Sequence, residues 1–154
     1  MAPGTDPVAA LKASPLFAGF TDTGLTILAG ITAPHNYPQG TPLFVENMMS
    51  DSLLVIVEGR VTLSAKNKLG TEVTLGEIGA GDYLGELSLI TPGQRMCTAT
   101  ATTSVRALEI RQADFQKLLT TKPQACVKLL MGIVAKFGQK VADNKDALRS
   151  LLKS

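Results

Sequence analysis

The sequence predicts a mainly β domain, a sandwich or a barrel, with helices at both ends. Short β-branched and aliphatic runs fill residues 41–110, turn residues separate them at regular spacing, and segments of helical periodicity flank them. The 154 residues have the length of one domain. We expect N-terminal helices at 1–32, a β-roll at 33–111 and C-terminal helices at 112–154.

Two helices are predicted at the start of the chain, over residues 7–16 and 22–31, where apolar residues recur at helical spacing. Asp22 is placed to cap the second helix. Pro34 and Pro38 then end the helical pattern.

The strands are predicted from six runs with turn residues between them. The runs are PLFV, SLLVIV, RVTLSA, EVTLGEI, MCTATAT and SVRALEI. The segments VEGRV and KNKLGTE indicate hairpin turns, in which glycine adopts a positive φ at low cost. No helix-length segment interrupts the runs, which argues against a parallel α/β sheet.

Two helices are predicted after the strands, over 112–119 and from residue 122 or 123 almost to the end. Apolar positions in the last helix alternate in steps of three and four, the spacing of a coiled-coil seam. β-branched residues and one asparagine in this seam favour a coiled coil of two parallel helices, and hence a homodimer. The alternative is that this face of the helix packs on the chain's own barrel. The seam residues are Val127, Leu130, Val134, Phe137, Val141, Asn144, Leu148 and Leu151.

Composition argues against several functional classes. The formal net charge of +2 is small for a nucleic-acid binder. No apolar run is long enough to span a bilayer and the N-terminus does not resemble a secretory signal, so we expect a cytoplasmic protein without membrane contact. Cys97 and Cys126 are predicted to be buried free thiols rather than metal ligands. With His35 as the only histidine, we expect no enzyme, no cofactor and no metal.

The segment GDYLGELSLITPGQRMCTATA places one acid, Glu86, and one base, Arg95, in a small and apolar run. Gly85 leads into a predicted short helix at 86–90, whose free N–H groups suit an anion. A guanidinium donates hydrogen bonds to two phosphate oxygens at once, and a carboxylate accepts a hydrogen bond from a sugar hydroxyl. The two residues therefore predict a site for a compact nucleotide; the alternative is an ion pair between them.

This segment resembles the phosphate-binding cassette of the cyclic nucleotide-binding domain family, of the cAMP receptor and protein kinase A regulatory-subunit type. The family pattern is F-G-E-L-A-L, followed after a short gap by P-R-A-A-T. The predicted opening helices and first strands also resemble the family, so the resemblance covers nearly the whole chain. It implies a jelly-roll β-barrel, or double-stranded β-helix, with the last helix as a lid.

The resemblance implies that Glu86 takes the ribose 2′-OH and Arg95 the cyclic phosphate, with the N–H groups of Gly85, Ser88 and Met96 around the same anion. The ligand-binding residues it implies are Gly85, Glu86, Leu87, Ser88, Arg95, Met96 and Cys97. The sequence departs from the pattern at Gln94, which replaces proline, and at Met96 and Cys97, which make the pocket floor bulkier. Met96 offers no hydroxyl, which favours cAMP over cGMP. Asn47 replaces a usual glycine and tolerates a positive φ.

The resemblance implies a non-enzymatic cyclic-nucleotide sensor. We expect a stand-alone domain, because family members usually transmit binding to an attached kinase, channel or DNA-binding domain, and the sequence shows none. Its output would then pass through the C-terminal helix to a partner protein or a dimer, with Phe137 or an aliphatic residue capping the base. The alternative is a ligand-free domain of the same fold that serves as an interaction or dimerisation module, which Met96 and Cys97 favour.

Overall fold

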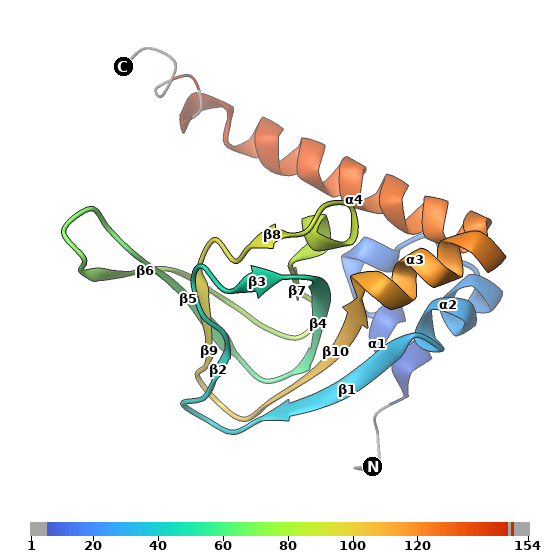
Figure 1. The fold of residues 1–154 in the computed structure, drawn as a ribbon, viewed down its shortest axis with the longest axis horizontal. Coiled ribbons are helices and arrows are strands. Elements are labelled where there is room, and N and C mark those ends of the chain that lie inside the picture. The colour runs from blue at the N-terminus through green and yellow to red at the C-terminus, as the bar shows by residue number, and fades with distance from the viewer. Residues whose placement is uncertain (1–5, 148, 150–154) are drawn as a thin grey trace.

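The computed structural model describes residues 6–147 and 149. It combines antiparallel sheets with flanking helices, and the helices α1, α2 and α3 gather at one end of the sheets while α4 runs along the top (Figure 1). The helical elements are α1 (Pro7–Lys12), η1 (Pro15–Phe17), α2 (Asp22–Ala29), η2 (Glu86–Leu89), α3 (Gln112–Thr121) and α4 (Pro123–Asp143).

Within residues 6–147 the strands form two four-stranded sheets and one two-stranded ribbon. The first sheet has the order β1-β10-β4-β7, the second β2-β9-β5-β6, and the ribbon pairs β3 with β8. The strands are β1 (Thr32–Tyr37), β2 (Pro42–Phe44), β3 (Met49–Ser50), β4 (Ser52–Glu58), β5 (Val61–Lys66), β6 (Glu72–Ile78), β7 (Tyr83–Leu84), β8 (Gly93–Gln94), β9 (Thr98–Ala101) and β10 (Val105–Arg111).

Strand β4 separates two hydrophobic cores. Leu53 and Val55 pack with the helices on one face, and Leu54 and Ile56 pack between the two sheets on the other. Burial on both faces explains why β4 is a continuous apolar run rather than an alternating one. In the described part of the chain each strand pairs only within its own sheet. The prediction of antiparallel sheets with flanking helices is therefore confirmed, whereas a closed barrel is not observed.

The helices at the start are shorter than predicted. Helix α1 ends at Lys12, because Pro15 disfavours a helical conformation in the residue before it, and the chain resumes as the 3₁₀ turn η1. Thr21, rather than Asp22, caps α2: its Oγ1 accepts from the N–H of Gly24 at 3.1 Å.

Strand β1 occupies a segment that the prolines had marked only as the end of a helix. Pro34 is tolerated there because β1 is an edge strand that pairs with β10 alone. The hairpin predicted at KNKLGTE is confirmed by the β5–β6 pairing. The hairpin predicted at VEGRV is wrong, because β4 and β5 belong to different sheets and the chain crosses between them at Gly59.

Helix α4 is held to the core by a face different from the predicted seam. Ala125, Cys126, Leu129 and Ile133 are buried. Helix α4 ends at Asp143, where Asn144 folds its side-chain amide onto the carbonyl of Lys140 at 2.7 Å, and residues 145–147 are helical again. The predicted last helix is therefore present but interrupted at Asn144, whose amide bonds to the backbone of its own helix. Leu148 and Leu151 lie outside the described residues.

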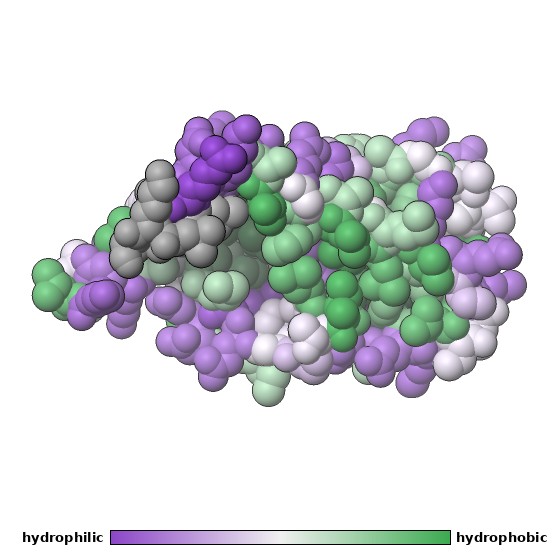
Figure 2. All heavy atoms as spheres, turned by 90° about the horizontal axis from the view of Figure 1, so that it is seen from above, coloured by the Kyte–Doolittle hydropathy of each residue, from purple (hydrophilic) through white to green (hydrophobic). Residues whose placement is uncertain are grey.

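The remaining seam residues form an exposed apolar stripe. Val127, Val134, Phe137 and Val141 are 42–64% exposed, whereas Leu130 packs against the chain's own core. Figure 2, which looks down on this side of the molecule, shows apolar residues gathered along it. The alternative that this face packs on the chain's own sheets is therefore wrong for Val127, Val134, Phe137 and Val141, whereas Leu130 does pack on the core. No helix in the described residues is long and apolar enough to cross a membrane.

Candidate functional site

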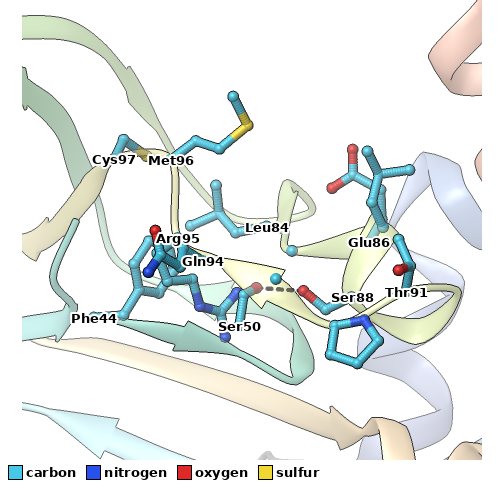
Figure 3. Close-up of a pocket in the computed structure, with 14 residues that line it drawn as sticks. Phe44, Ser50, Leu84, Glu86, Ser88, Thr91, Gln94, Arg95, Met96 and Cys97 are labelled. Atoms are coloured by element: carbon cyan, nitrogen blue, oxygen red, sulfur yellow. Dashed lines mark hydrogen bonds between the residues drawn. The ribbon is translucent and has the colours of Figure 1, made fainter. Parts of the chain in front are cut away.

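A pocket of about 300 Å³ opens at the turn between β7 and η2, at the small end of the range for small-molecule sites. It draws its walls from β2, β3, β7, η2, β8 and the segment that follows β8 (Figure 3). All seven residues predicted for the site border it. The lining residues are Phe44, Ser50, Leu84, Gly85, Glu86, Leu87, Ser88, Thr91, Pro92, Gly93, Gln94, Arg95, Met96 and Cys97.

Arg95 is the buried cation of this pocket, with only 7% of its surface exposed. Its Nη1 donates to the carbonyl of Ser52 and its Nη2 to the Ser52 hydroxyl, both at 3.2 Å. The guanidinium also lies 4.3 Å from the ring centroid of Phe44. Two backbone hydrogen bonds, from Asn47 N–H to Arg95 O and from Arg95 N–H to Met48 O, fix the main chain.

The charge of Arg95 is not neutralised by a direct partner. Among the described residues no carboxylate forms an ion pair with it, and its Nε has no hydrogen-bond partner. Burial lowers the pKa of Arg95, and the more distant carboxylates of Asp51 and Glu109 oppose that shift. A buried guanidinium without a counter-ion is costly, and an incoming anion supplies what is missing.

Gly85 is required by the position of this guanidinium. The residue has φ +79°, and a Cβ placed on it would collide with Nη1 of Arg95 and with the carbonyl of Ser52. The same turn continues into η2, which confirms the predicted short helix with a 3₁₀ geometry. Asn47, predicted to tolerate a positive φ, has φ 73°.

Glu86 does not pair with Arg95, so the alternative of an ion pair between these two residues is wrong. Its carboxylate instead accepts from Nζ of Lys140 on α4 at 3.4 Å, and that ammonium lies 5.1 Å from the ring centroid of Tyr83. Burial, then the charges of Glu86 and Asp82, raise the pKa of Tyr83. Sequence reasoning missed Lys140, because a contact between residues 54 positions apart leaves no local pattern.

The other predicted site residues lie as follows. The N–H of Ser88, a predicted anion donor, donates to Gly85 O at 3.0 Å and is therefore already occupied within the turn. Its role towards an anion stays a prediction. Met96 borders the pocket but is 89% exposed and does not fill it, contrary to the bulkier floor expected from the sequence. Cys97 is half-buried and Cys126 buried, and both are free thiols. Burial and Glu46 raise the pKa of the Cys97 thiol, and Arg95 opposes that shift.

A polar network behind Arg95 extends across the first sheet, from β4 through β10 to the edge strand β1. Ser52 also hydrogen-bonds Glu109, whose Oε1 lies 3.0 Å from Nε2 of His35 and 3.2 Å from Nε of Arg111. Burial alone would raise the pKa of Glu109, but these hydrogen bonds and the charge of His35 bring it below its ordinary value of 4.5. Ser52 and Glu109 carried no sequence signal, because both lie within apolar strand runs.

Replacing Gly85 with alanine should destabilise the fold by about 1–2 kcal/mol from the positive φ alone, and should also displace the Arg95 guanidinium. Chemical denaturation measures the first effect. Gly93→Ala is the matched control, because no atom lies within 4 Å of a Cβ at that position of the same pocket. Equal stability of the two variants would contradict the backbone strain assigned to position 85.

Replacing Glu109 with glutamine should remove part of the acid sensitivity of the fold. A carboxylate whose pKa is lowered in the folded state contributes stability above its ordinary value of 4.5 and loses it as the pH falls through the lowered pKa. The stability gap between wild type and Glu109→Gln should therefore be widest near pH 7 and close in acid. Urea denaturation between pH 3 and 7 measures it, with the more exposed Glu77→Gln as control; a gap independent of pH would contradict this role.

Comparisons with known proteins agree with this geometry. Residues 34–122 match the model of the cyclic nucleotide-binding domain. The cyclic AMP receptor protein of Thermus thermophilus is 30% identical over 113 residues, which are 73% of this chain and 52% of that protein. A cyclic nucleotide-gated potassium channel of Rhizobium etli is 31% identical over 114 residues, 74% of this chain and 30% of the channel.

The fold comparison points the same way. A crystal structure of the N-terminal domain of a transcriptional regulator from Streptomyces coelicolor has a TM-score of 0.77 and 32% identity, and the match covers 90% of this chain and 94% of that one. This chain spans only about half the length of the first curated relatives it matches, 52% and 51%. The motif, the fold and the matched residues together show that the chain belongs to the cyclic nucleotide-binding domain family.

Proposed function

We propose that the chain is a non-enzymatic, cytoplasmic cyclic-nucleotide sensor that binds cAMP in preference to cGMP. The single observation that carries this proposal is the buried, unpaired guanidinium of Arg95 in a small pocket that also presents the Glu86 carboxylate. Arg95 would hold the cyclic phosphate and Glu86 the ribose 2′-OH. The β-roll would act as a jelly-roll frame around the ligand.

A cyclic nucleotide suits the chemistry of both charged groups. The guanidinium donates to phosphate oxygens, and the carboxylate accepts from a hydroxyl that carries no charge. A single ligand with both groups satisfies each without bringing phosphate next to carboxylate. Met96 has no hydroxyl to offer a guanine base, which favours adenine.

Helix α4 is the proposed output of the sensor. The Lys140 ammonium joins this helix to the carboxylate that would take the ribose, so ligand binding and the position of α4 act on one contact. Binding can shift α4 only by the difference in affinity between its two positions. The exposed apolar stripe Val127–Val134–Phe137–Val141 would pass the change to a second copy or another protein.

Contact with nucleic acid is not proposed for the residues present, because their net charge is small. Several relatives carry names of transcriptional regulators, and the chain spans about half of them.

Isothermal titration with cAMP, cGMP and AMP tests the ligand. We expect cAMP to bind more tightly than cGMP, and AMP to bind weakly. Arg95→Ala should weaken cAMP binding at least about 100-fold, since several hydrogen bonds to a charged group are lost, with a smaller effect on stability. Arg60→Ala, an exposed arginine paired with Glu77, is the control. Absence of binding by folded, nucleotide-free wild type would refute the proposal.

Lys140→Met keeps the aliphatic stem and removes the ammonium, so it should uncouple α4 from the ligand. Hydrogen exchange followed by mass spectrometry should show that cAMP protects residues 136–143 in the wild type and that the variant loses most of this protection. Lys136→Met, on the same helix, should behave like the wild type. The coupling role would be contradicted if Lys140→Met kept the full protection.

Val134→Glu tests the proposed homodimer. Val134 is 64% exposed in a single chain, so the substitution should leave the monomer fold intact while it places a charge in the seam. Sedimentation velocity should show a dimer for the wild type and a monomer for the variant. A monomeric wild type at tens of micromolar would argue against the dimer.

A further inference from the structure

A buried pair of serine hydroxyls in the pocket has no role in the sensor as described so far. Ser50 comes from β3 and Ser88 from η2; their residues are 6% and 5% exposed. Their Oγ atoms are hydrogen-bonded to each other, and both residues line the same pocket as Arg95 (Figure 3).

This pair retains one hydrogen-bond donor. Each serine hydroxyl has one hydrogen, and the bond between the two uses only one of them. The other hydrogen meets no further acceptor among the residues that the structure describes. A buried donor without an acceptor costs free energy, and an anionic oxygen entering the pocket removes that cost.

Both serines are connected to groups that touch the guanidinium. Ser50 precedes by two positions Ser52, which accepts both hydrogen bonds of Arg95. Ser88 donates its N–H to the carbonyl of Gly85, the residue against which the guanidinium packs. Ser88 shares the turn η2 with Glu86, but Figure 3 shows Ser50 beside the Arg95 guanidinium, so the hydroxyl pair reaches the cationic end of the pocket.

We propose that the Ser50–Ser88 hydroxyl pair is a second donor to the phosphoryl group, acting on one of its two non-bridging oxygens beside Arg95. The inference rests on the proposed function, because it assumes that a cyclic nucleotide enters this pocket. It adds a specificity device: the two non-bridging oxygens, which are already stereochemically distinct, would be bound differently, since one meets a neutral hydroxyl in addition to the guanidinium.

The two phosphorothioate diastereomers of cAMP test the proposal, since each replaces one non-bridging oxygen with sulfur, a weaker acceptor. Binding of cAMP and both diastereomers is measured for wild type, Ser50→Ala, Ser88→Ala and the double variant. Removing both hydroxyls leaves no orphan partner, so the double variant should fold. Ser64→Ala is the matched control: a buried serine outside the pocket lining, bonded to Glu72 at 2.6 Å.

The double variant should bind cAMP about tenfold more weakly, as for the loss of one hydrogen bond to a charged acceptor, and Ser64→Ala should be unchanged. The affinity ratio of the two diastereomers should also shift several-fold in the double variant, which a general loss of folding would not cause. Unchanged cAMP affinity in the double variant, or an equal loss for all three ligands, would overturn the role of the hydroxyls alone. Absence of cAMP binding by the wild type would overturn the proposed function as well.

Discussion

The site depends on one interaction, the burial of the Arg95 guanidinium against Gly85 and Ser52. The two hydrogen bonds to Ser52 and the ring of Phe44 fix the cation, and the glycine leaves the space it occupies. This arrangement needs β4, which supplies Ser52, to be fixed on both faces, and it is: one face packs on the helices and the other on the second sheet. Packing against both hydrophobic cores therefore fixes the strand whose Ser52 holds the Arg95 guanidinium.

The two charges of the pocket face different structural elements. Arg95 hydrogen-bonds to Ser52 of the first sheet, whereas Glu86 forms an ion pair with Lys140 of α4. A ligand with an anion at one end and hydroxyls at the other would engage both, and so would act on the sheet and on α4 together. Because the buried residues of α4, from Ala125 to Ile133, all lie at or before its midpoint, we propose that its later turns are the part that such a ligand would reposition.

Local rules of sequence predicted what depends on neighbouring residues. The short helix at Glu86, the positive φ of Asn47 and the β5–β6 hairpin all follow from residues within a few positions. Strand β1 was missed, because Pro34 is compatible with a strand only at a sheet edge, and edges are set by the topology. The same holds for Lys140, Ser52 and Glu109, whose partners lie tens of residues away. Asn144 was assigned to a seam by its spacing, but its side chain hydrogen-bonds to the backbone and interrupts the helix there.

The most direct test of the central claim is a crystal structure of the complex with cAMP. The account predicts that the cyclic phosphate accepts hydrogen bonds from the Arg95 guanidinium and that the ribose 2′-OH donates to Glu86. A nucleotide bound elsewhere, or one whose phosphate faces α4 while Arg95 contacts only Ser52, would contradict it.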